Sequence, residues 1–178
     1  MSATKSILVL GAGELGIEVL RSLALHPSRK DTQIAVLRRT VPSKIDEARF
    51  EPLNIAVVAG DVANDSQRAL SAMFSSFHTV INCTGMAVPP STQIKVAQAA
   101  IEGSVVRYFP WQFGGDYDAI GCGSPQDLFD IQLDVRDILR AQTEMEWVVC
   151  CVHSASKSTA ADNALTDHLE WNVHKLPL

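Results

Sequence analysis

The sequence lacks the patterns by which several classes of protein are recognised. None of its four cysteines forms a CxxC pair, and none stands at zinc-ligand spacing to a histidine, so we expect no metal site. No serine lies in a GxSxG elbow, which argues against a hydrolase. The first apolar run, residues 7–10, is too short for a signal peptide or a bilayer span. We therefore expect a cytoplasmic protein that does not enter a membrane.

Positive charge is also scarce. The chain has 15 Lys and Arg against 20 Asp and Glu, and its basic clusters are only residues 29–30 and 38–39. Binding to nucleic acid needs a basic surface that neutralises phosphates, so we expect no nucleic-acid partner. The 178 residues, 47% of them hydrophobic, suit one soluble domain with a core of its own.

What the chain does contain is an alternation of short apolar runs with amphipathic stretches. The runs predict strands at residues 7–10, 33–37, 55–59, 79–82, 105–109 and 147–152. The stretches predict helices at 14–25, 65–74, 91–103 (with Ser91 as its N-cap) and 125–142. Repeated strand–helix–strand units require a parallel sheet with right-handed crossovers. The fold class predicted is α/β, a Rossmann-type doubly wound sheet of about six strands.

The composition changes near residue 153. Residues 153–167 are mostly small and polar and offer little to bury. The predicted organisation is a Rossmann domain over 1–152 and a loosely structured tail over 153–178, with at most a frayed helix over about 159–171.

A glycine turn follows the first predicted strand and opens the first predicted helix. In this context Gly11 permits a tight turn, Gly13 lets the backbone approach a pyrophosphate, and Gly16 lets helix and strand pack closely. The N-terminus of the helix offers unpaired N–H groups and partial positive charge to phosphates. The alternative is a structural glycine turn without a ligand.

The end of the second predicted strand indicates which dinucleotide is bound. NAD sites place an acidic residue there to hold the ribose hydroxyls, whereas this strand ends in Arg38 and Arg39. Arginine binds a 2′-phosphate through paired hydrogen bonds, so the sequence predicts NADP(H). The alternative is that both arginines are merely solvated.

The other strand ends should line the same crevice. Asp61 could touch the adenine or could only shape a turn, and Thr84 with Gly85 should flank the nicotinamide ribose. Trp111 and Phe113 could stack on an aromatic substrate or pack in the core. The predicted cofactor-binding residues are Gly11, Gly13, Glu14, Leu15, Gly16, Arg38, Arg39, Asp61, Thr84 and Gly85.

Charged residues recur along the last predicted helix. Asp134, Arg136, Asp137 and Arg140 stand three or four residues apart, which predicts a charged, solvent-exposed face.

Taken together, GAGELG at residues 11–16, Arg38, YFPWQFG at 108–114 and DLFDIQLDVR at 127–136 resemble the NmrA-like group of atypical short-chain dehydrogenases. Within that group the chain is similar to the isoflavone reductase and aromatic alcohol reductase branch, over roughly residues 5–150. The resemblance implies NADPH-dependent reduction of a small aromatic or unsaturated carbonyl compound, in secondary metabolism. Some relatives have lost catalysis and act as NADP sensors.

The chain departs from this family at a residue linked to catalysis. Plant members carry a lysine, thought to act in proton transfer, where this sequence has Gln132. Glutamine does not exchange a proton near neutral pH. There is no Tyr-x-x-x-Lys pair either. The catalytic candidates are Gln132, Tyr117 and Asp116, and a structural role in the loop is the alternative for the last two.

The second departure is length. Relatives continue after the sixth strand into a substrate lobe, whereas here this lobe is expected to be largely absent. The stretch from Cys151 onward does not resemble the family and looks like unrelated sequence joined to its core. Early termination, altered splicing or a shifted reading frame would each produce this. We therefore predict an NADPH-dependent oxidoreductase acting on a small molecule. The alternatives are a catalytically silent NADP(H) sensor with a protein partner, or a truncated remnant.

Overall fold

A computed structural model of the chain describes residues 5–29, 31–39, 44–123, 127–151 and 172–173. Its centre is a parallel sheet of strands in the order β3-β2-β1-β4-β5-β6, which confirms the predicted Rossmann-type fold. The strands are β1 (Lys5–Leu10), β2 (Thr32–Arg38), β3 (Ile55–Ala59), β4 (Thr79–Asn82), β5 (Arg107–Phe109) and β6 (Glu146–Trp147). The strand order reverses between β1 and β4, and ligands of such sheets bind at this point.

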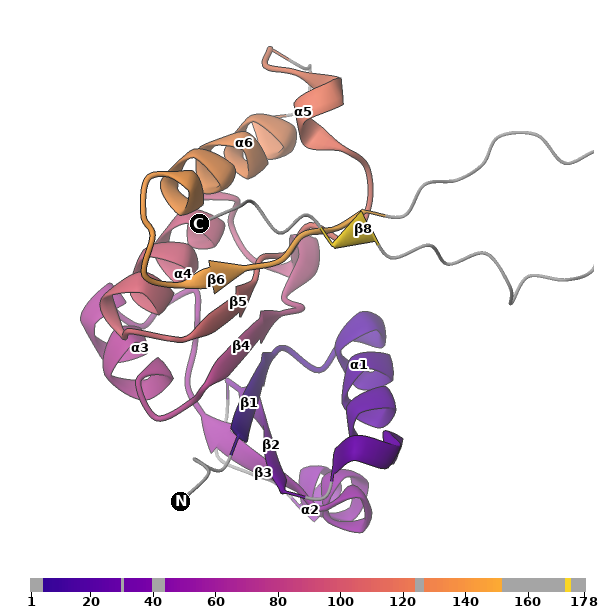
Figure 1. The fold of residues 1–178 in the computed structure, drawn as a ribbon. Helices are drawn as coiled ribbons and strands as arrows, with labels where there is room; N and C mark the ends of the chain where they lie inside the picture. The colour runs from indigo at the N-terminus through magenta and orange to yellow at the C-terminus, as the bar shows by residue number, and fades with distance from the viewer. Residues whose placement is uncertain (1–4, 30, 40–43, 124–126, 152–171, 174–178) are drawn as a thin grey trace, which may run out of the picture.

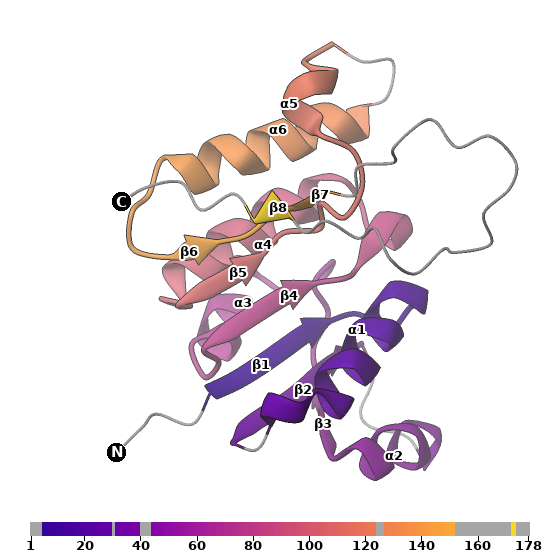
Figure 2. The same cartoon turned by 45° about the vertical axis from the view of Figure 1, so that its right-hand side comes forward.

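Helices cover both faces of the sheet (Figure 1). On one face lie α1 (Glu14–Leu25) and α2 (Lys44–Phe50). On the other lie α3 (Gln67–Phe74), α4 (Ser91–Glu102) and α6 (Asp127–Arg140), with the short α5 (Tyr117–Ile120) at one end of α6 (Figure 2). Single 3₁₀ turns occur at Pro27–Arg29, Glu51–Leu53 and Gly85–Ala87.

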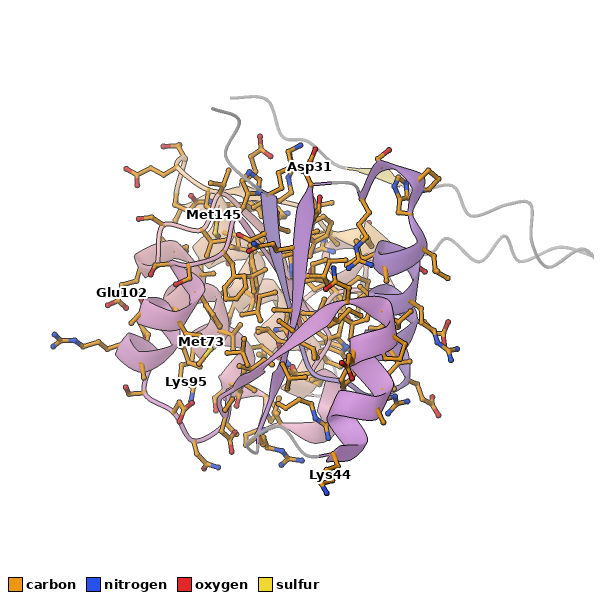
Figure 3. The ribbon with its side chains drawn as sticks, turned by 90° about the horizontal axis from the view of Figure 1, so that it is seen from below. Asp31, Lys44, Met73, Lys95, Glu102 and Met145 are labelled. Atoms are coloured by element: carbon orange, nitrogen blue, oxygen red, sulfur yellow. The ribbon has the colours of Figure 1, made fainter. Side chains whose placement is uncertain are left out.

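The core forms two apolar layers because neighbouring residues of a strand point to opposite faces. In β1, Leu8 and Leu10 pack with α3, α4 and α6, whereas Val9 packs with the helices on the other side. All three side chains are fully buried. Figure 3 shows side chains filling both layers, while Glu102 of α4 points away from them.

Three local expectations were wrong. Helices α2 and α5 fall where only connections were predicted, because both are too short to show a helical repeat of apolar residues. Ser91 is the first residue of α4 rather than its cap, and Pro90 holds the cap position without a side-chain hydrogen bond.

The sixth predicted strand is divided. β6 pairs with β5 only at Glu146 and Trp147, and then β7 (Cys150–Cys151) pairs antiparallel with β8 (Asn172–Val173). The division follows from Pro110, which ends β5 and has no N–H to offer a neighbouring strand. The predicted boundary at 152/153 and the helix over 159–171 lie outside the described residues. Within the described ranges, no helix has the length and apolar content needed to cross a bilayer.

The inner face of α6 should carry much of the stability. Leu139 is fully buried in the larger core layer, so Leu139→Ala should lower the free energy of unfolding by about 2–5 kcal/mol through lost contacts and a residual cavity. Urea denaturation measures the change. Leu25→Ala is the control, because Leu25 is 75% exposed and should change stability little. Equal losses for the two variants would contradict this packing.

Candidate functional site

The glycine turn and the end of β4 meet at the carboxyl edge of the sheet. A Cβ placed on Gly11 would lie 3.1 Å from the carbonyl oxygen of Cys83 and 3.3 Å from the Cα of Thr84. The backbone N–H of Cys83 also donates to the carbonyl oxygen of Leu10 over 2.9 Å. With φ at 93°, Gly11 adopts a conformation that side chains disfavour. The turn therefore lies directly against the β4 loop, where the strand order reverses.

Gly16 and Gly13 have opposite surroundings. A Cβ on Gly16 would stand 2.2 Å from the carbonyl oxygen of Gly11, so α1 can approach β1 only because no side chain is present. A Cβ on Gly13 would meet no described atom within 4 Å. Gly13 is the N-cap of α1 and makes no side-chain cap bond, and Glu14 and Leu15 after it are exposed. Side chains therefore leave this helix N-terminus open to an incoming group.

Arg38 and Arg39 stand at the carboxyl end of β2, one strand away from the turn. Arg38 is half-buried and Arg39 is exposed. The carbonyl oxygen of Arg38 accepts a hydrogen bond from the N–H of Gly60, which joins the ends of β2 and β3. The structure therefore places both arginines at the carboxyl edge of the sheet, and their contact with a 2′-phosphate stays a prediction.

Asp61 shapes the loop that follows β3. Its Oδ1 accepts from the N–H of Ala63 at 2.8 Å, and its Oδ2 accepts from the Asn64 amide at 2.8 Å. These bonds, with a smaller contribution from the charge of Arg39, lower the pKa of Asp61. The turn-forming role weighed from the sequence is thus present, while contact with adenine remains a prediction.

The loop after β4 is held by buried amides that the sequence analysis missed. Asn82 accepts from the N–H and the hydroxyl of Thr84, at 3.1 and 2.8 Å. Gln93 of α4 donates to the Thr84 hydroxyl and the Gly85 carbonyl, at 3.3 and 3.4 Å. Both amide side chains are buried. The available signal was an asparagine at the end of a mostly apolar strand and a glutamine on the inner face of a helix.

The loop after β5 lies beside this site. The indole Nε1 of Trp111 lies 3.9 Å from the position of a Cβ on Gly85, which itself adopts a φ of 64°. Phe113 packs against the core layer on the side of α1. Of the two aromatic residues, Trp111 is therefore next to the predicted nicotinamide end, and Phe113 takes the packing role.

The charged face predicted on α6 is wrong for one residue. Arg136 is only 4% exposed, and its Nε donates to the buried Gln112 over 2.7 Å. Its Nη1 contacts Asp116 at 3.1 Å and Asp118 at 2.5 Å. A spacing pattern cannot reveal that α5 folds over this position and supplies carboxylates.

The catalytic candidates are engaged in the same region. Asp116 caps α5 and pairs with Arg136, whose guanidinium lies 5.6 Å from the centroid of the Tyr117 ring. The Tyr117 ring is buried and lies 5.7 Å from that of Phe129. These contacts favour the structural role weighed for both residues.

Gln132 is in a different situation. It is fully buried, and neither polar atom of its side chain has a hydrogen-bond partner in the described part of the chain. Leaving a buried amide without partners is unfavourable by about 1–3 kcal/mol, so a hydrogen bond from a polar partner would stabilise it. Gln132 stays a candidate for contact with a ligand group or a water.

Within the described ranges, no three or more His, Cys, Asp or Glu side chains lie together in a group that could hold a metal ion. Cys83 is buried, and burial raises the pKa of its thiol to about 12. It therefore behaves as a small apolar side chain rather than as a nucleophile.

Comparison with known proteins assigns the family. Residues 3–158 match the NmrA-like family. The chain belongs to the NmrA-like family. An NmrA-like family domain-containing oxidoreductase of Gibberella moniliformis (strain M3125 / FGSC 7600) is 48% identical over 151 residues, which cover 81% of this chain and 50% of the relative. Phenylcoumaran benzylic ether reductase TP7 of Nicotiana tabacum is 27% identical over 78% of this chain and 45% of its own length.

Solved structures share the fold of this NmrA-like chain. An isoflavone reductase superposes with a TM-score of 0.67 at 20% identity, covering 86% of this chain and 52% of its own. A leucoanthocyanidin reductase–NADPH complex from Vitis vinifera gives 0.66 at 21% identity, with 84% and 50% covered. AtPrR2 with NADP⁺ and (+)pinoresinol gives 0.64 at 22%, with 79% and 47% covered. The chain thus spans about half the length of these relatives.

Alanine substitutions at Gly13 and Gly16 should have different effects on the stability of the fold. Gly16→Ala should lower the free energy of unfolding by about 1–3 kcal/mol or prevent folding, because its Cβ would clash with backbone. Gly13→Ala should lower it by no more than about 1 kcal/mol, because the site is open and its φ of −73° suits alanine, although alanine is a poorer N-cap residue than glycine. Chemical denaturation of both variants tests this, and a large loss in Gly13→Ala would contradict the open turn.

The α5–α6 ion pairs should make stability fall in acid. Hydrogen bonds from Arg140 and then Arg136 hold the pKa of Asp118 below its usual 3.8. A carboxyl with a depressed pKa stabilises the fold above its unfolded-state pKa, and this contribution is lost as pH falls through the folded-state value. Asp118→Asn should therefore flatten the loss of stability below about pH 4. Urea midpoints from pH 6 to pH 3 measure the slope, and an unchanged slope would exclude these pairs as its source.

Proposed function

We propose that this chain binds NADP(H) at the glycine turn and supports reduction of a small molecule. The observation that carries the proposal is the open N-terminus of α1 at Gly13, which lies between the β4 loop at Thr84 and the basic end of β2 at Arg38. Amides of a helix N-terminus bind a pyrophosphate, and a guanidinium one strand away suits a 2′-phosphate.

The residues present fit this cofactor. The space at Gly13 admits a phosphate close to the backbone, because no described atom occupies the place of a Cβ. The predicted contacts then extend along the sheet edge, from Arg38 and Arg39 at the adenosine phosphate to Thr84 and Gly85 at the nicotinamide ribose. Solved relatives titled as NADP⁺ or NADPH complexes share this fold, which supports the assignment.

The bound cofactor would supply a hydride, and the protein would bind and orient the reactants. Trp111, beside Gly85, would offer an aromatic surface next to the nicotinamide end. This arrangement suits a small aromatic or unsaturated carbonyl compound as the substrate. A role in secondary metabolism and a cytoplasmic location remain predictions from the sequence. A relative named phenylcoumaran benzylic ether reductase, and a solved structure titled with (+)pinoresinol, support an aromatic substrate class.

A second function is favoured by one position. The family resemblance predicts that Gln132 takes the place of a lysine of the plant reductases. Its buried amide cannot act as a general acid or base near pH 7. In a silent NADP(H) sensor, this site would report cofactor binding to a protein partner and would not turn over a substrate.

One experiment separates the two functions. The purified chain is titrated with NADPH and NADP⁺ by fluorescence and is then assayed for NADPH oxidation with a panel of aromatic enals and ketones. Binding with turnover supports the reductase, and binding without turnover supports the sensor. A folded chain that binds neither form would refute the proposed function.

Arg38 should determine the choice between the two dinucleotides. We expect NADPH to bind more tightly than NADH. Arg38→Ala should weaken NADPH binding by about 10- to 100-fold, since a charged hydrogen-bond partner of the 2′-phosphate is lost. NADH binding should change little. Arg68→Ala is the control, because Arg68 is an exposed arginine of α3. Equal wild-type affinity for the two cofactors would contradict the role of Arg38.

A further inference from the structure

Three polar side chains form a closed ring behind the β4 loop. Asn82 Nδ2 donates to Gln93 Oε1 over 2.8 Å, Gln93 Nε2 donates to Thr84 Oγ1 over 3.3 Å, and the Thr84 hydroxyl donates to Asn82 Oδ1 over 2.8 Å. A side bond runs from Asn82 Nδ2 to the buried Tyr108 hydroxyl over 3.3 Å. The ring connects the last residue of β4, the inner face of α4 and the loop predicted to meet the nicotinamide ribose.

Two backbone groups fix the direction of every bond in the ring. The Thr84 N–H can only donate, so the atom of Asn82 that it contacts at 3.1 Å must be the carbonyl oxygen. The Gly85 carbonyl can only accept, so the atom of Gln93 that faces it at 3.4 Å must be the amide nitrogen. Both amides are therefore oriented without ambiguity, and the hydroxyl proton of Thr84 must point to Asn82.

These hydrogen bonds leave the Thr84 hydroxyl able to accept one more hydrogen bond. A hydroxyl has one proton and two lone pairs, and the ring uses the proton and one lone pair. Any group that meets Thr84 from the cofactor side must therefore be a hydrogen-bond donor. Ribose hydroxyls are donors, whereas the carbonyl oxygen of a carboxamide or a phosphate oxygen is not.

We propose that Gln93 is a positioning residue that, with Asn82, locks the Thr84 hydroxyl as an acceptor for a hydroxyl of the nicotinamide ribose. The proposal rests on the proposed function, since it names a contact within that cofactor site. Gln93 itself is 3% exposed and lies behind the loop, so it acts through Thr84 and Gly85. Its amide also holds the Gly85 carbonyl, which fixes the loop beside Trp111.

The test separates the two halves of the cofactor. NADPH contains the nicotinamide ribose, whereas adenosine 2′,5′-bisphosphate contains only the adenosine half. Gln93→Glu keeps the shape of the side chain but replaces its amide donor by a carboxylate next to the Gly85 carbonyl. We expect about 10-fold weaker NADPH binding, the loss of roughly one hydrogen bond to Thr84, and unchanged binding of the bisphosphate. Gln98→Glu is the matched control, since Gln98 is exposed on the same helix.

A second pair of variants decides the question if Gln93→Glu fails to fold. Thr84→Val removes the hydroxyl and should weaken NADPH binding by about 10-fold, while Thr84→Ser should retain most of the affinity. An NADPH analogue without the hydroxyls of the nicotinamide ribose should bind wild type and Thr84→Val equally. The measurements are dissociation constants from fluorescence, with the unfolding midpoint of each variant recorded alongside.

The outcomes are distinguishable. A selective loss of NADPH affinity in Gln93→Glu, or in Thr84→Val but not Thr84→Ser, supports the proposal. Equal weakening of both ligands, identical behaviour of Gln93→Glu and Gln98→Glu, or full NADPH affinity in Thr84→Val overturns it while leaving the cofactor site in place. Failure of folded wild type to bind either ligand overturns the cofactor site as well.

Discussion

The close approach of α1 to the first strand is the constraint on which the rest of the candidate site depends. Gly16 packs against the carbonyl of Gly11, and Gly11 packs against the backbone at Cys83 and Thr84. These backbone contacts leave no room for side chains, so they hold the helix N-terminus at the point where the strand order reverses. Gly13, in the same turn, has no described atom within 4 Å of the position of a Cβ, whereas Gly11 and Gly16 are in close backbone contact.

Two buried polar networks hold the loops around that turn. Asn82 and Gln93 fix the β4 loop, and Gln112 with Arg136 connects the β5 loop to α5 and α6. Leaving a polar group unpaired away from water is unfavourable, so these contacts restrict the arrangements open to the two loops. Gln132, whose backbone carbonyl accepts from Gln112, is the exception whose side-chain amide has no partner among the described residues.

Family membership establishes the architecture of this chain, whereas its site geometry bears on what the chain binds. The NmrA-like match and the strand order establish the architecture, and the relatives are named as reductases. The chain nevertheless spans about half the length of those relatives, so their substrates describe proteins with more sequence than this one. What this chain itself supplies is the edge of the sheet at Gly13, Thr84 and Arg38. This edge supports dinucleotide binding more directly than any particular reduction.

The sequence by itself determined the α/β alternation, the glycine turn and the basic end of β2, because buried parallel strands and a tight βα turn impose local patterns that neighbouring residues record. Only the tertiary structure decided that Arg136 is buried, that strand six divides after Trp147, and that Gln93 reaches Thr84. Each of these depends on residues outside the segment concerned: carboxylates from the α5 region, a partner strand that ends at Phe109, and a helix packed behind the β4 loop. Spacing along a single segment cannot encode such partners, since hydrogen bonding and burial are settled only when the elements assemble.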